Sequence, residues 1–104
     1  MIFVLKPAII LITQDQNVTE GENVTLSCYV SGTPTPNVSW IKPGGQRHYV
    51  HMLEFTNILR SQAGEYKCEA SNECGNATKT ANIIVLRKFD SFFSLKVYVY
   101  LYVL

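Results

Sequence analysis

Hydrophobic and polar residues alternate along several short stretches of this chain, and no long window has the spacing of an amphipathic helix. From Val24 to Val30 the sequence reads VTLSCYV, in which every second residue is apolar. Successive side chains of a strand point to opposite sides, so Leu26 and Cys28 would share one side and Tyr29 would lie on the other. This pattern predicts a β-strand with one buried face.

Further stretches show the same alternation. They occupy residues 38–42, 49–55, 64–70 and 77–86, and residues 8–13 are expected to form an edge strand. Turn-forming residues separate the runs, including TPTP at 33–36 and PGG at 43–45. Several short strands at this spacing predict an all-β, antiparallel sandwich or barrel.

Length and composition favour one globular domain. The chain has 104 residues, of which 47% are hydrophobic and 16% charged, so it is unlike a disordered chain. Its formal net charge is +1, and no basic cluster indicates nucleic-acid binding. No internal repeat is visible.

Cysteines and glycosylation motifs indicate an oxidising compartment. Three cysteines allow one disulfide with one thiol left over. Four N-x-S/T motifs favour a secreted setting, where disulfides persist. Their asparagines are Asn17, Asn23, Asn37 and Asn76.

The two ends of the chain differ from its centre. Residues 1–6 are interpreted as an extension without a clear secretory signal, and the chain as a piece of a longer protein. Residues 88–104 form an apolar tail whose longest uncharged apolar run is eight residues, against the roughly twenty of a membrane helix. The tail is either a fragment end without a native role, a truncated membrane anchor or an added strand.

Three inward-facing residues point to a two-layer core. Cys28 and Cys68 lie on strands from distant parts of the chain, and Trp40 lies between them. A disulfide between these cysteines would close a loop of about forty residues. It would lower the conformational entropy of the unfolded chain and so stabilise the fold by roughly 4 kcal/mol. Trp40 could then pack flat against the sulfurs.

These positions resemble an immunoglobulin-like domain of the I-set or C2 type over residues 7–87. The resemblance rests on GENVTLSC at 21–28, GTPTP at 32–36, Trp40, the L-x-F-x-x-I run from Leu53, and G-x-Y-x-C at 64–68. It implies a two-sheet sandwich with a Cys28–Cys68 disulfide. It also implies a core of Trp40, Leu26 and Leu53, and a tyrosine corner at Tyr66.

Two departures from the family pattern change the expectation. Gln62 stands where the family usually has aspartate, so no salt bridge from Arg47 or Arg60 to this position is expected. Only twelve residues separate Trp40 from Leu53, so the C′ and D strands must be abbreviated or merged.

The third cysteine and the histidines offer little chemistry. Cys74 falls at the predicted F–G turn. It could remain a free thiol, form a disulfide with another domain or chain, or pair with Cys28 or Cys68 instead. No histidine or helix start lies nearby to activate it. His48 and His51 are expected to be surface residues without a metal site.

The resemblance implies an extracellular or cell-surface binding module in cell adhesion or receptor recognition, as in adhesion and axon-guidance ectodomains. Its partners would be other immunoglobulin-like or extracellular proteins. The alternative is a structural spacer repeat of an extracellular-matrix protein. No catalytic motif, cofactor site or metal site is visible, and an association with membrane would require a missing or truncated anchor.

Overall fold

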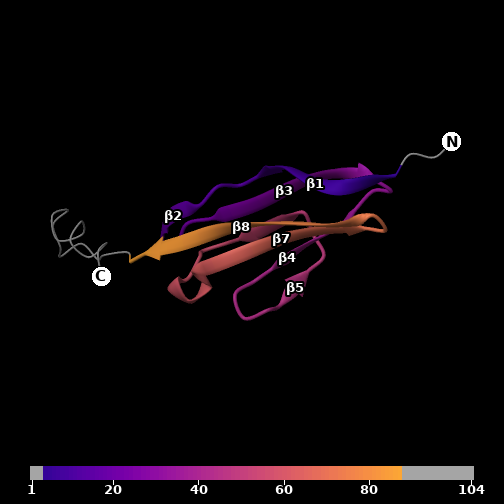
Figure 1. Cartoon of the computed structure of the whole chain (residues 1–104). Helices are drawn as coiled ribbons and strands as arrows, with labels where there is room; N and C mark the ends of the chain where they lie inside the picture. Colours follow the sequence, from indigo (N-terminus) through magenta and orange to yellow (C-terminus); the bar gives the residue numbers. More distant parts are fainter. Residues whose placement is uncertain (1–3, 88–104) are drawn as a thin grey trace, which may run out of the picture.

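A computed structural model of the chain describes residues 4–87, and nearly every element in that range is a strand (Figure 1). A single 3₁₀ turn, η1, spans Arg60–Gln62. The strands are β1 (Leu5–Ile12), β2 (Gln16–Thr19), β3 (Val24–Thr33), β4 (Asn37–Ile41), β5 (Arg47–His48), β6 (Met52–Phe55), β7 (Gly64–Asn72) and β8 (Gly75–Leu86).

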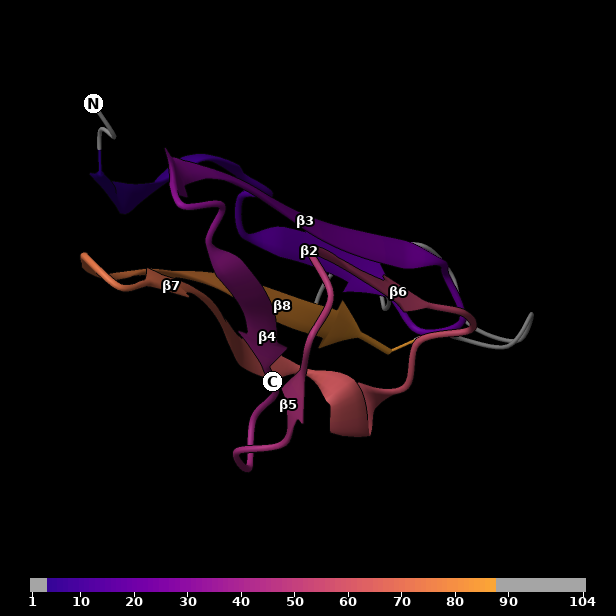
Figure 2. The ribbon, with the colours of Figure 1, turned by 90° about the vertical axis from the view of Figure 1, so that its right-hand side faces the viewer.

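The strands form two sheets that lie face to face (Figure 2). One sheet has three strands in the order β1-β3-β6, and the other has five in the order β2-β8-β7-β4-β5. All the pairings are antiparallel except that of β2 with β8, which is parallel. The expected antiparallel sandwich of two sheets is therefore confirmed, with one parallel edge.

The core lies between the sheets and follows the alternation of the sequence. In β3 the inward residues Val24, Leu26 and Cys28 are buried, whereas Thr25 and Tyr29 are exposed. In β7 the inward residues are likewise buried. The fully or almost fully buried side chains include Leu26, Cys28, Trp40, Ile58, Tyr66, Cys68, Ala70, Ala81 and Ile83.

The connection between the sheets after β4 is as short as the sequence indicated. The two residues of β5 pair with β4, and β6 then pairs with β3 in the opposite sheet. Residues 49–51 between them form no strand. The strand predicted over residues 49–55 is therefore shorter in the structure, where it spans Met52–Phe55. The reason is that the chain crosses between the sheets before Met52.

The first strand region is split between the two sheets. β1 begins at Leu5, two residues before the expected domain start, and pairs with β3. The chain then crosses to the other sheet, where β2 pairs with β8. The sequence did not reveal β2, because Val18 is its one buried residue and four residues give too short a pattern.

No helix within residues 4–87 is long and apolar enough to cross a membrane. The apolar tail at 88–104, with its three interpretations, lies outside the described residues.

Candidate functional site

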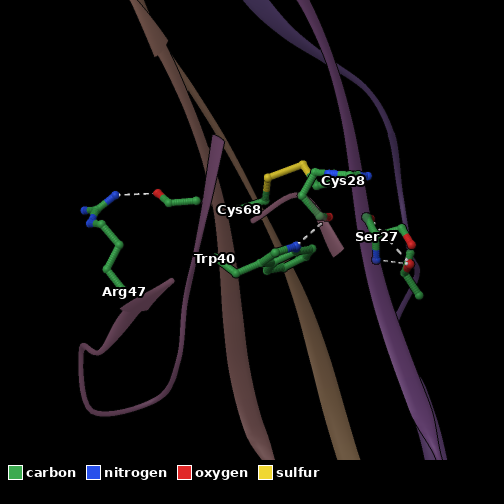
Figure 3. Close-up of a disulfide and its surroundings, with 8 residues drawn as sticks. Ser27, Cys28, Trp40, Arg47 and Cys68 are labelled. Atoms are coloured by element: carbon green, nitrogen blue, oxygen red, sulfur yellow. Dashed lines mark hydrogen bonds between the residues drawn. A yellow bond between two sulfur atoms is a disulfide. The ribbon is translucent and has the colours of Figure 1, made fainter. Parts of the chain in front are cut away.

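The centre of the domain is a covalent clamp between the sheets. Cys28 of β3 and Cys68 of β7 form a disulfide with a Cα–Cα distance of 6.5 Å. Trp40 lies beside it, and its indole N–H donates a hydrogen bond of 3.0 Å to the carbonyl oxygen of His51 (Figure 3). All three side chains at this clamp are completely buried, so the clamp is a scaffold and offers no reactive group to solvent.

A hydrogen bond from Tyr66 holds the η1 turn, which connects β6 to β7. The Tyr66 hydroxyl donates a hydrogen bond to the carbonyl oxygen of Gln62, and its ring meets Phe55 edge-on at 5.4 Å between centroids. Burial raises the pKa of Tyr66 above its ordinary value of 10.0. The tyrosine-corner geometry implied by the resemblance is thus present.

The Gln62 side chain caps the same turn. Its Oε1 accepts a hydrogen bond of 2.8 Å from the backbone N–H of Leu59. Arg47 pairs with Glu69 at 2.8 Å and Arg60 with Glu20 at 3.4 Å. Both arginines therefore pair with carboxylates away from position 62.

The outward surface of the five-stranded sheet is polar except at Ile84, which is 53% exposed, and we call this surface the polar face. Arg47 anchors one side of it, because its Nη1 donates to Ser39 Oγ at 2.7 Å and to Glu69 Oε1 at 2.8 Å. This contact buries Ser39, which is 3% exposed although it points away from the core. Other outward residues of this face are Glu65, Lys67, Ser71, Thr78, Thr80 and Asn82.

Three of the four predicted glycosylation sites lie on the polar face. Asn37 and Asn76 are both paired with Ser71, so they occupy one row across β4, β7 and β8. Asn17 lies on β2 beside Ile84, at the opposite end of the sheet. All of these asparagine side chains are exposed and accessible to modification.

The fourth predicted site lies next to the three-stranded sheet. Asn23 is exposed and immediately precedes β3. Its side-chain Oδ1 accepts a hydrogen bond of 3.1 Å from the backbone N–H of Asn57. This bond fixes the amide next to the β6–η1 connection.

The outward surface of the three-stranded sheet is different in character. Leu11 and Tyr29 are paired across β1 and β3, and they are 62% and 43% exposed. Val50 and Met52 are 43% and 38% exposed on the adjoining segment. The sequence placed Tyr29 on the outer side of its strand, but it did not show which apolar residues of other strands would join it.

Cys74 lies in the β7–β8 turn, as predicted. It is half-buried and makes no disulfide within the described residues. Its backbone N–H donates a hydrogen bond of 2.8 Å to the side chain of Asn72. Cys28 and Cys68 are bonded to each other, so Cys74 is the partner of neither in this structure.

The histidines do not both lie at the surface. His51 is exposed, and its ring lies 5.9 Å from that of Tyr29. His48 is half-buried, and its Nε2 is buried without a hydrogen-bond partner, so the expectation of a surface residue is wrong there. The reason is the pairing of β5 with β4, which sets His48 opposite Trp40.

Within residues 4–87 the domain has an open surface crevice but no cluster of metal-ligating side chains. No group of three or more His, Cys, Asp or Glu residues within 4–87 could hold a metal ion. An open crevice of about 410 Å³ is lined by Ile12, Thr13, Gln14, Asp15 and Thr80. The Asp15 carboxylate in this crevice accepts a hydrogen bond of 2.8 Å from the backbone N–H of Asn82. This bond holds the β1–β2 connection against β8.

Comparisons with known proteins agree with this geometry. The family profile described as immunoglobulin domain matches residues 6–72. Limbic system-associated membrane protein of Gallus gallus is 38% identical over 81 residues, which are 74% of this chain and 24% of that protein. Neural cell adhesion molecule L1 of Takifugu rubripes is 37% identical over 73 residues, which are 62% of this chain and 6% of that protein.

A solved structure shows the same architecture. The crystal structure of Dpr11 IG1 bound to DIP-gamma superposes with a TM-score of 0.75 at 29% identity, over 79% of this chain and 48% of that one. Together with the family profile, this likeness defines the class: the chain belongs to the immunoglobulin domain family. It spans less than a quarter of the length of the relatives described above.

Proposed function

We propose that this domain is an extracellular recognition module for cell adhesion, which binds other immunoglobulin-like protein domains. The observation that carries the proposal is the pair of broad, exposed sheet faces on one covalently clamped core. The relatives support it, because one is named as a neural cell adhesion molecule and another as a membrane protein. In the similar crystal structure, an immunoglobulin domain is bound to a second immunoglobulin protein.

An extracellular location fits the covalent chemistry of the domain. The buried disulfide requires an oxidising compartment. All the predicted glycosylation sites are exposed, and we propose that they carry glycans. Intact-mass measurement of the chain secreted from animal cells, before and after glycosidase treatment, should show glycan masses that disappear. An unchanged mass would contradict this part of the proposal.

We infer that residues 7–87 are the recognition unit and that residues 1–6 lead into it. The buried clamp, the tyrosine corner and the sheet faces are all built within that range, although β1 already begins at Leu5. We propose no catalysis, cofactor or metal for this unit. Affinity would come from side chains of a sheet face or its loops, as is usual for protein–protein recognition.

A binding array tests the proposal against a spacer role in an extracellular-matrix protein. The full chain is coupled to a pentameric carrier, whose multivalency makes micromolar contacts detectable, and is presented with immunoglobulin-domain ectodomains. Saturable binding to at least one ectodomain is expected. Binding to none, with a folded and disulfide-bonded chain on the carrier, would favour the spacer.

A further inference from the structure

The outer side of the three-stranded sheet bears a contiguous apolar patch, formed by Ile10, Leu11, Tyr29, Val50 and Met52. Leu11 pairs with Tyr29, and the extra residue of the β1 bulge, Ile10, is 66% exposed beside them. The Tyr29 ring contacts that of His51, which brings the segment containing Val50 and Met52 next to β3. Three chain segments thus contribute to one surface.

This patch is uncharged, unlike the polar face. None of its five residues can ionise near neutral pH. Two titratable groups border it, because the exposed imidazole of His51 contacts the Tyr29 ring and Glu54 is the next outward residue after Met52 on β6. The polar face instead carries the Arg47–Glu69 ion pair and Lys67. A second uncharged surface can cover the patch without leaving a charge buried and unpaired, whereas a charged surface cannot.

Three of the four predicted glycans lie away from the patch. Asn17, Asn37 and Asn76 all lie on the polar face, at the other side of the domain. Asn23 immediately precedes β3, six residues from Tyr29 and about 20 Å along the strand, but only four residues, or about 13 Å, from Ser27, which pairs with Met52. A macromolecular partner therefore meets less obstruction at the patch than at the ends of the polar face.

The area of the patch is large enough for pairing with the same patch on a second copy of this chain. Its exposed fractions correspond to an area on the order of 500 Å², near the upper end for a single surface patch of a monomer. Two copies placed face to face would bury about 1,000 Å² in total, which is the lower limit of specific interfaces. A two-fold arrangement also brings like chemistry together, since each copy presents the same uncharged surface.

We propose that the apolar patch is a self-association surface, on which two copies of this domain pair face to face through their three-stranded sheets. An interface of this small area is typical of a weak or transient complex. At a cell surface many copies would act together and the contact would become effective. The inference deepens the proposed function by naming a surface and a partner for it.

Sedimentation velocity of the full chain at about 10 µM to 1 mM tests the proposal, with Cys74 alkylated to prevent covalent dimers. The unmodified sequence should shift from monomer to dimer over this range. Tyr29→Glu and Leu11→Glu place a charge in the patch and should each weaken the association at least tenfold. The matched control Thr80→Glu puts the same charge on the polar face, where Thr80 is exposed beside Lys67, and should dimerise like the parent.

Two results would overturn the proposal. One is a parent chain that stays monomeric at 1 mM, and the other is a dimer that both patch variants retain, because association would then use another part of the chain. Tyr29→Ser and Leu11→Ser repeat the test if the glutamate variants fail to fold. Binding in the ectodomain array is measured separately, so self-association can fail while the recognition function stands, and the reverse.

Discussion

Tyr66 shows how one side chain can be both a core residue and a lock on the backbone. Its ring fills the space beside Phe55, and its hydroxyl holds the carbonyl of Gln62 at the end of η1. The role of this residue could be predicted, because the spacing G-x-Y-x-C is local in the sequence. The substitution of glutamine for the usual aspartate kept the turn, since the amide oxygen of Gln62 still accepts a backbone hydrogen bond.

Tyr66→Phe should lower the free energy of unfolding by about 1–2 kcal/mol at pH 7, because the carbonyl of Gln62 loses its donor. Burial raises the pKa of Tyr66 in the folded state. The stability that depends on the protonated hydroxyl is therefore complete below the unfolded pKa, near 10, and is lost as pH rises through the folded pKa. Urea unfolding from pH 7 to 11 measures both effects.

The control for this experiment is Tyr49→Phe. Tyr49 is 76% exposed, so its removal should leave the stability at pH 7 and its decline in alkali nearly unchanged. The Tyr66→Phe variant should show a shallower decline above pH 10 than the parent. An equal decline in the two proteins would show that Tyr66 is not the group responsible.

The strands differ in how far the sequence predicted them. β3 and β7 have several inward residues each, so their alternation is clear and they end close to the expected positions. β2 has one buried residue, and its parallel partner β8 is more than sixty positions away. Whether the first strand region stays in one sheet or crosses depends on long-range contacts, such as that of Asp15 with Asn82.

The start of β7 depends on a close approach that only glycine permits. Gly64 has a φ of 140°, and a Cβ there would lie 2.8 Å from Cγ of Pro43 in the β4–β5 connection. Gly64→Ala should therefore lower the free energy of unfolding by about 2–3 kcal/mol, through backbone strain together with a steric clash. Chemical denaturation at pH 7 measures the change.

Gly44→Ala is the matched control in the neighbouring loop. Gly44 also has a positive φ, of 94°, but nothing lies within 4 Å of a Cβ placed there. This variant should lose only about 1 kcal/mol, from backbone strain alone. Equal losses for the two variants would mean that the contact with Pro43 relaxes freely and does not constrain the crossover.

At the scale of the whole molecule, the disulfide joins the two sheets at their centre. The cysteines are 40 residues apart, so the link restricts a large part of the unfolded chain. A double variant, Cys28→Ala with Cys68→Ala, avoids an unpaired thiol and should lose about 2–5 kcal/mol, enough to unfold many domains of this size. Thermal unfolding followed by circular dichroism reports the loss.

Cys74→Ser separates this effect from the mere removal of a thiol. Cys74 is half-buried in a turn and makes no disulfide in the described part of the chain, so the variant should melt within a few degrees of the parent. A double cysteine variant as stable as the parent would show that packing around Trp40 suffices to hold the sheets together.

The sequence by itself determined the strands of the core, the pairing of the cysteines through the family pattern, and the shortened stretch after Trp40. These features are encoded locally, in alternation, in turn residues and in fixed spacings between a few positions. Tertiary structure alone decided the burial of His48, the ion pair of Arg47 with Glu69, and the gathering of Leu11, Tyr29 and Met52 on one surface. Each of these depends on which strands become neighbours, and strand pairing joins residues whose separation in sequence carries no local signal.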